Sequence, residues 1–425
     1  MSDQTQTLSP AREKWLLLTL AAIQFTHIMD FMILMPLGPQ LMRLFGISTV
    51  QFGLLVSAYT FSAGLSGFLS SFVMDRFDRK RVLVVLYAGF VLGTLACALA
   101  PAYEVLLAAR ILTGAFGGVL AAVTNAVVGD AIPMERRGTA MGFVTASFSA
   151  ASVFGVPFGL FLASRFSWHA PFLFLVAAGI SVMALIVRSV PVMTQHMQTG
   201  HKALNPLEVM QQAVSSPAQR HALLLTVLMM LSQFAIIPFL SPSMVANVGF
   251  SEADLTWIYL LGGGITLFTG PQIGRLADRL GKFRVLVVFL LLSIIPQLLI
   301  TQLGPTPIAL VLLLTTSFFI VSGGRMIPAM ALITGTVEPR NRGSFMGIQS
   351  ALQQVAAGVA SLVAAQIVVK DVHGHLLHYE KVGYLSAAAS LLCIWAAWRM
   401  SRAMREQGRG VRGEGLGGRQ EAVGT

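Results

Sequence analysis

Charged residues are scarce in this sequence. Asp, Glu, Lys and Arg make up 11% of the 425 residues, whereas soluble globular proteins usually carry about 25%. Apolar residues account for 55%, and runs of roughly 20 of them recur, each long enough to cross a bilayer core of about 30 Å as a helix. This composition excludes an ordinary soluble protein and predicts an all-α membrane protein.

Cysteines and catalytic motifs are also scarce. The two cysteines, Cys97 and Cys393, lie inside apolar runs and are interpreted as small core residues rather than as a disulfide or a metal site. No segment matches the nucleotide-binding pattern Gly-x-x-x-x-Gly-Lys-Ser/Thr. The sequence therefore indicates neither an enzyme nor ATP as an energy source, and no cofactor or metal is expected.

The apolar runs predict twelve transmembrane spans. They lie near residues 15–37, 52–73, 82–100, 104–128, 139–162, 170–187, 221–245, 255–276, 285–303, 308–334, 343–369 and 382–398. A long polar stretch separates the first six from the last six. We therefore predict a six-helix bundle over 1–189, a cytoplasmic linker over 190–220 and a second six-helix bundle over 221–401. The Gly- and Arg-rich residues 402–425 are predicted to be a disordered cytoplasmic tail.

The positive charge follows the predicted topology. Of the 29 Lys and Arg, 23 fall in one set of loops and ends, and four in the opposite set. Positive residues concentrate on the cytoplasmic side of membrane proteins, so both termini are predicted to be cytoplasmic in a multi-pass protein of the cell (inner) membrane. The net charge of +11 is thus a topology signal, and no nucleic-acid partner is expected.

Two charged loops occur twice. Residues 274–284 (GRLADRLGKFR) repeat residues 71–81 (SFVMDRFDRKR) at an offset of 203, and residues 342–347 repeat residues 137–142 at an offset of 205. Such an offset, close to half of the chain, indicates an internal duplication, which is how many transporters are built.

These loops resemble the signature of the major facilitator superfamily, Gly-x-x-x-Asp-Arg-x-Gly-Lys/Arg. The second copy is intact, with Gly274, Asp278, Arg279, Gly281 and Lys282. The first copy departs from the pattern, with Ser71 and Asp78 where the family usually has glycine. The resemblance implies two bundles that rock around a substrate bound between them near the midplane.

Two further motifs carry the resemblance. The segment 109–118 (ARILTGAFGG) is similar to the Arg-plus-glycine pattern of the family's fourth span. Gly155, Pro157 and Gly159 are similar to the Gly-Pro-Gly pattern of its drug:proton antiporters, with one residue inserted before the proline, as in the arabinose and sugar efflux permease branch. These residues predict a helix bend, which either limits leakage between the halves or is a plain packing kink.

Charged groups inside spans cost about 2.5–3.5 kcal/mol each on insertion scales, so they are functional candidates by default. Asp30 lies in the first span with His27 one turn before it, and Arg110 lies in the fourth. We predict that Asp30 carries protons while Arg110 and His27 set its proton affinity. The alternative is a fixed Asp30–Arg110 pair that only joins two helices.

Arg325, in the tenth span, has no carboxyl group in its own span. It either faces the cavity and binds an anionic or hydroxyl-rich substrate, or stabilises a helix interface through carbonyl groups. Amide side chains are predicted to line the same substrate cavity, although each is also explained by an interhelical hydrogen bond. They are Gln24, Gln233, Gln349 and Gln353.

The repeated loops are predicted to act as latches on the cytoplasmic side. Arg79 is expected to pair with Asp130, and Lys282 with Glu338, while Asp75 accepts hydrogen bonds from the start of a helix. Arg76, Gly274, Asp278, Arg279 and Gly281 complete the predicted gating loops. In the alternative reading, these charges only enforce topology.

The predicted function is proton-coupled efflux of a small organic solute, such as a drug, a sugar or a nucleobase, by antiport and alternating access. The alternatives are a proton symporter or facilitative uptake carrier, or a non-transporting membrane sensor. The expected partners are the solute, protons and the lipid bilayer, with the chain acting as a monomer. His373, His375 and His378 are interpreted as part of a solvated external loop.

Overall fold

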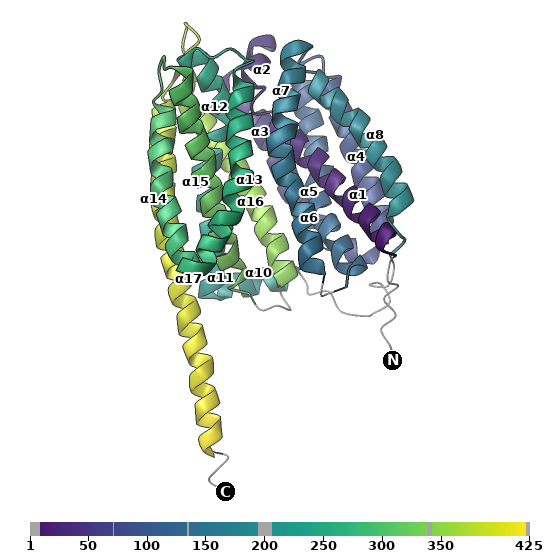
Figure 1. Cartoon of the computed structure of the whole chain (residues 1–425), viewed down its shortest axis with the longest axis vertical. Coiled ribbons are helices and arrows are strands. Elements are labelled where there is room, and N and C mark those ends of the chain that lie inside the picture. The colour runs from purple at the N-terminus through teal and green to yellow at the C-terminus, as the bar shows by residue number, and fades with distance from the viewer. Residues whose placement is uncertain (1–8, 71, 134–135, 194–205, 338–341, 422–425) are drawn as a thin grey trace.

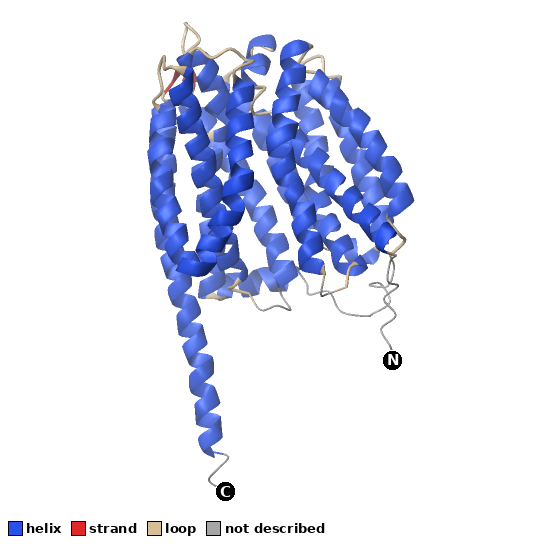
Figure 2. Cartoon of the chain, viewed as in Figure 1, coloured by secondary structure: helices blue, strands red, loops and turns tan. Residues whose placement is uncertain are grey.

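The computed structural model describes residues 9–70, 72–133, 136–193, 206–337 and 342–421. Figures 1 and 2 show long, roughly parallel helices, with the first half of the chain at the right and the second half at the left. Helix α1 (Pro10–Ile33) begins and helix α17 (Tyr379–Glu421) ends at the lower end of this view. We call that end of the molecule the terminal side and the opposite end the far side.

The first half is helical throughout. Its elements are α1 (Pro10–Ile33), α2 (Gly38–Leu44), α3 (Thr49–Ser70), the 3-10 turn η1 (Met74–Arg76), α4 (Arg79–Ala98), α5 (Tyr103–Ala131), α6 (Arg137–Ala150), the π-helical segment η2 (Ala151–Gly155), α7 (Val156–Arg165) and α8 (Ala170–Ser189).

The second half repeats this plan. Its elements are α10 (Pro206–Ser215), α11 (Pro217–Phe234), α12 (Ile237–Ser243), the π-helical segment η3 (Met244–Val248), α13 (Leu255–Leu280), α14 (Lys282–Thr301), α15 (Ile308–Thr334), α16 (Arg342–Ile367), strands β1 (Val369–Lys370) and β2 (Leu376–Leu377), and α17 (Tyr379–Glu421). The strands form a small antiparallel hairpin at the far side.

The helices confirm an all-α membrane fold. Within the described residues, eleven helical segments are long and apolar enough to cross a membrane. The remaining predicted span is α13, which has 26 residues and is diluted by the glycines at 262–264. With α13, the helices correspond to the twelve predicted spans in two bundles.

Two glycines with positive φ occupy equivalent positions in the two halves. Gly46 follows α2 with a φ of 63°, and Gly249 follows η3 with a φ of 88°. Glycine adopts this left-handed conformation without the steric cost that other residues incur. The two glycines are 203 residues apart, the same offset as the two charged loops.

The two halves meet along two helix pairs. α3 packs against α16, and α13 packs against α7 and η2. Small residues let the backbones approach closely: a Cβ at Gly53 would collide with Ala365, and one at Gly263 would lie 2.9 Å from the carbonyl oxygen of Ser152.

Polar contacts join the halves at the far side. Arg43 Nη1 lies 2.7 Å from Glu252 Oε1, and Gln40 donates a 2.6 Å hydrogen bond to Glu252 Oε2. Nearby, the hydroxyl of Thr49 donates to the carbonyl of Val368 at 2.7 Å. We call Gln40, Arg43 and Glu252 the far-side clasp.

Disorder was predicted from residue 402, whereas in the structure α17 continues as a helix to Glu421 and leaves the bundle at the terminal side (Figure 1). The physical reason is that nucleation is the costly step of helix formation. The transmembrane part of α17 supplies the nucleus, so the polar segment needs only propagation. An ion pair one turn apart, Arg402 to Glu406 at 2.8 Å, supports the extension.

Candidate functional site

The intramembrane charges of the first half form an ion pair. Arg110 Nη1 of α5 lies 2.8 Å from Asp30 Oδ2 of α1, and the side chains are only 1% and 0% exposed. Thr94 of α4 donates a 3.2 Å hydrogen bond to the other carboxylate oxygen. Three helices therefore meet at one buried carboxyl group, and both of its oxygens have partners.

An aromatic ring covers the arginine. The guanidinium carbon of Arg110 lies 4.4 Å from the ring centroid of Tyr59 on α3, a cation–π distance. The glycine-rich segment of α5 makes this contact possible, because a Cβ at Gly114 would collide with the Tyr59 backbone and one at Gly118 with that of Ala63. The sequence motif around Arg110 thus brings α3 against α5.

His27 lies beside this pair without hydrogen bonding to it. Its ring is buried and packs against the rings of Tyr59 and Phe90, 6.4 and 6.0 Å away between centroids. Neither ring nitrogen has a hydrogen-bond partner among the described residues. A buried polar group without a partner is costly. Both ring nitrogens of His27 are therefore candidates to bind a proton or a ligand.

Arg325 occupies a different polar cluster in the second half. It is fully buried, and its Nη1 donates to the hydroxyls of Ser232 at 2.8 Å and Ser390 at 3.3 Å. Its Nη2 donates to Gln233 Oε1 at 3.3 Å. Gln297 of α14 donates to Ser232 at 3.1 Å, so α11, α14, α15 and α17 meet here.

The predicted cavity glutamines are only partly brought together. Gln233 contacts Arg325, but Gln349 is buried and donates to Thr226 at 3.2 Å, which is an interhelical hydrogen bond. Gln353 is partly buried. The side-chain oxygen of Gln24 is buried without a hydrogen-bond partner.

The predicted bend in the fifth span is a π-helical segment. Pro157 has no N–H, and the ladder widens just before it, where the amide of Val156 donates to the carbonyl of Ala151. Gly155 and Gly159 face α1, where added Cβ atoms would crowd Met29 and Ile33. The bend therefore packs closely against the turn of α1 that contains Asp30.

On the terminal side, Arg79 Nε lies 3.1 Å from Asp130 Oδ2. The side chain of Asp75 and all of Glu338 lie outside the part of the chain that the structure describes. The contacts predicted for these two residues therefore stay predictions. Arg76, Asp278, Arg279 and Lys282 are exposed, and Gly281 has a φ of 94° in the turn between α13 and α14.

Asp78, which stands where the signature has glycine, is the N-cap residue of α4. Its carboxylate accepts hydrogen bonds from the amides of Lys80 and Arg81 at the start of α4, and from the amide of Met193 at 2.7 Å. The Asp78 side chain therefore connects the N-terminus of α4 to the segment after α8 by hydrogen bonds.

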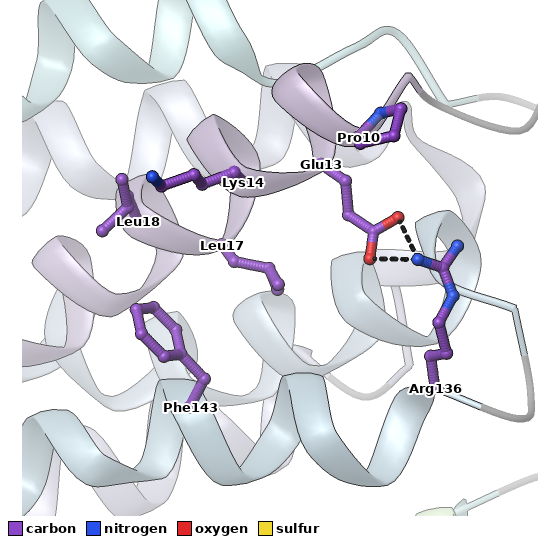
Figure 3. Close-up of a pocket in the computed structure, with 7 residues that line it drawn as sticks. All are labelled: Pro10, Glu13, Lys14, Leu17, Leu18, Arg136 and Phe143. Atoms are coloured by element: carbon purple, nitrogen blue, oxygen red, sulfur yellow. Dashed lines mark hydrogen bonds and ion pairs between the residues drawn. The ribbon is translucent and has the colours of Figure 1, made fainter.

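Figure 3 shows a separate pocket of about 330 Å³ on the terminal side, between α1 and α6. Glu13 and Arg136 pair across it at 3.0 Å, beside Lys14 and the apolar Leu17 and Phe143. It involves none of the intramembrane charges described above.

Sequence reasoning missed the neutral members of these sites. Tyr59, Thr94, Ser232 and Ser390 are residue types common in apolar spans, and their spacing gives no signal. The charged Arg43 and Glu252 of the far-side clasp were also missed, because charges in short loops are ordinary.

Comparison with known proteins decides the family. The model of the Major Facilitator Superfamily matches residues 20–219 and again residues 222–420, one match to each half. The chain belongs to the Major Facilitator Superfamily. Transporters of this family carry small molecules, and the chain is accordingly a multi-pass membrane transporter rather than an enzyme.

Curated relatives agree with this assignment. The uncharacterized MFS-type transporter YceJ of Bacillus subtilis is 27% identical over 358 residues, covering 81% of this chain and 86% of the relative. The inner membrane transport protein YdhP of Escherichia coli is 26% identical over 268 residues, covering 61% and 67%.

Solved structures share the fold. A bacterial homolog of the human lysosomal transporter Spinster, in an inward-facing and unoccupied conformation, has a TM-score of 0.73 at 17% identity, covering 94% of this chain and 98% of that one. A D-xylose–proton symporter has a TM-score of 0.72 at 17% identity, covering 91% and 97%.

Proposed function

We propose that this transporter is a proton-coupled antiporter that moves a small organic solute out of the cell. The observation that carries the proposal is the buried Asp30–Arg110 pair at 2.8 Å. A fully buried carboxyl favours its neutral, protonated form, whereas the adjacent guanidinium favours the carboxylate. A change in hydration or in the position of Arg110 shifts this balance, so the site takes up and releases protons as the transporter changes conformation.

Tyr59 and Thr94 couple the pair to other helices. Tyr59 belongs to α3, which packs against α16 of the other half. If α3 shifts relative to α5 when its contact with α16 changes, the ring over Arg110 is displaced and the stabilisation of the cation changes. His27, beside Tyr59, is the second proton-binding group of the proposal.

The membrane orientation completes the proposal. We infer from the bias of Lys and Arg that the terminal side faces the cytoplasm, and we propose the inner membrane as the location, because the relative YdhP is an inner membrane transport protein. In this orientation the far-side clasp joins the two halves on the external side, as expected for a state that is closed to the outside. Arg79 and Asp130 are gating residues on the cytoplasmic side, and the bend at Pro157 limits leakage between the halves. The resemblance of Gly155, Pro157 and Gly159 to the pattern of drug:proton antiporters and of the sugar efflux branch favours a small organic solute, for which we propose a drug, a sugar or a nucleobase.

The test uses purified protein in liposomes with an imposed pH gradient, screened against drugs, sugars and nucleobases. We expect solute accumulation coupled to proton movement in the opposite direction. Asp30→Asn should abolish gradient-driven accumulation while retaining solute exchange in the absence of a gradient, because exchange requires no proton transfer.

Asp254→Asn serves as the matched control, since Asp254 is a carboxylate at the far end of α13 that interacts with Ser251. If Asp30→Asn retained gradient-driven accumulation, Asp30 would not be the proton carrier. If it lost exchange and accumulation equally, the pair would be a fixed structural link between α1 and α5.

A further inference from the structure

The described part of the second half contains a buried cation, Arg325, and no buried Asp or Glu. The hydrogen-bond partners of the Arg325 guanidinium there are neutral: two serine hydroxyls and the amide oxygen of Gln233. Among the described residues, no Asp or Glu lies within ion-pair distance of Arg325. Its Nε is also buried without a hydrogen-bond partner. A charge in this setting is costly unless a counter-charge reaches it.

The internal repeat shows where the counter-charge is missing. Gln233 follows Asp30 by 203 residues, the offset that also relates Gly46 to Gly249. The second half therefore has a neutral amide at the position where the first half has a carboxylate. Asp30 neutralises Arg110 at 2.8 Å, whereas Gln233 contacts Arg325 at 3.3 Å and leaves its charge in place.

We propose that the transported solute is an organic anion and that its carboxylate, or a similar acidic group, supplies the missing counter-charge at Arg325. This rests on the proposed transport function and names its substrate class. A planar guanidinium binds a carboxylate through two parallel N–H donors. Arg325 has the unpartnered Nε and the Nη2 that now donates to Gln233, so an anion that displaces the amide oxygen of Gln233 meets both groups.

The burial pattern indicates the direction of entry. Gln233 is partly exposed, whereas Arg325, Ser232 and Ser390 are buried. The serines, with Gln297 behind Ser232, hold the guanidinium in place from the inner side. The anion therefore approaches from the side of Gln233, and the serine hydroxyls remain as fixed partners of Nη1.

Two variants remove the net charge by different routes. Arg325→Gln neutralises the cation, and Gln233→Glu supplies an internal carboxylate at a side chain that already contacts Arg325. The second change stays compatible with folding, because the new carboxylate pairs with a cation that is already present. Gln233→Met is its matched comparison, with a side chain of similar length and no charge.

The experiment measures binding to purified protein, without a pH gradient, by thermal stabilisation and by titration. The probes are benzoate, nicotinate and succinate, each compared with its amide. We expect at least one carboxylate to bind the wild-type protein more tightly than its amide. Its dissociation constant should rise by at least about tenfold in Arg325→Gln, and should be at least about tenfold higher in Gln233→Glu than in Gln233→Met.

The outcomes separate this inference from the proposed function. If no carboxylate of the panel binds better than its amide, or if Gln233→Glu binds the anion as tightly as Gln233→Met, the anionic substrate is rejected even where protons drive transport of a neutral solute. If anion binding depends on Arg325 but no proton moves during transport, the substrate class stands and the proton-coupled function fails.

Discussion

Arg43 and Glu252 form an ion pair of 2.7 Å between α2 of the first half and the loop before α13 of the second. The side chain of Glu252 is 22% exposed and that of Arg43 is 63% exposed. Gln40 donates to the other carboxylate oxygen, so Glu252 is the centre of the far-side clasp. The clasp joins two halves that separate on this side in the proposed transport cycle.

Removing the clasp should favour opening of the far side. An exposed ion pair contributes about 0.2–1 kcal/mol, so Glu252→Gln should shift the equilibrium between closed and open far sides by about 1.4- to 5-fold. Spin labels at Leu44→Cys and Val372→Cys, both exposed and in opposite halves, report the separation. Arg402→Gln is the control, because its pair with Glu406 lies within α17. An unchanged distance distribution in Glu252→Gln would show that the clasp does not hold the closed state.

The ring of Tyr59, rather than its hydroxyl, should support Arg110. The hydroxyl is buried without a hydrogen-bond partner, whereas the ring lies 4.4 Å from the guanidinium carbon. Tyr59→Phe should therefore retain transport within about twofold, while Tyr59→Leu should lose about 0.5–2 kcal/mol of cation–π stabilisation. We expect transport in Tyr59→Leu to fall by about two- to thirtyfold, measured as initial rate in liposomes. Equal losses in both variants would assign the role to the hydroxyl.

Two glycines of α5 should respond oppositely to a methyl group. A Cβ at Gly118 collides with the backbone of Ala63, but one at Gly129 meets nothing within 4 Å. Gly118→Ala should destabilise the protein by about 1–3 kcal/mol through overpacking. Gly129→Ala should be neutral or slightly stabilising, because alanine is the better helix former. Thermal unfolding in detergent measures both, and similar melting temperatures would contradict close contact between α3 and α5.

The fold could be predicted from the sequence because membrane burial leaves few solutions. A backbone in lipid must satisfy its own hydrogen bonds, so apolar runs of sufficient length become helices. The Asp30–Arg110 contact follows from the same cost argument, since two opposite charges inside apolar spans lower each other's energy by pairing. The same argument identifies Arg325 as a costly charge inside a span. It does not predict the partners Ser232 and Ser390, because serine is common in apolar spans.

The remaining features depend on information that spacing does not contain. The far-side clasp joins residues of α2 to a loop residue more than 200 positions away, and only the docking of the halves brings them together. The helix after residue 402 depends instead on the preceding sequence. The composition of residues 402–425 does not show that a helix is already nucleated before them. Asp78 was read as a loss of the signature glycine, although an aspartate at that position can cap a helix.

The cap at Asp78 gives the last prediction. Its carboxylate accepts from two amides at the start of α4 and from the amide of Met193. Asp78→Ala should lower stability by about 1–2 kcal/mol, the usual cost of a lost N-cap, and should also release the segment after α8. Asp78→Asn should retain most of the stability, because its side-chain oxygen still accepts a hydrogen bond. Thermal unfolding measures the stability, and protease cleavage after Arg188 measures the release. If Asp78→Ala unfolded like the wild-type protein while cleavage stayed slow, the carboxylate would not connect these segments.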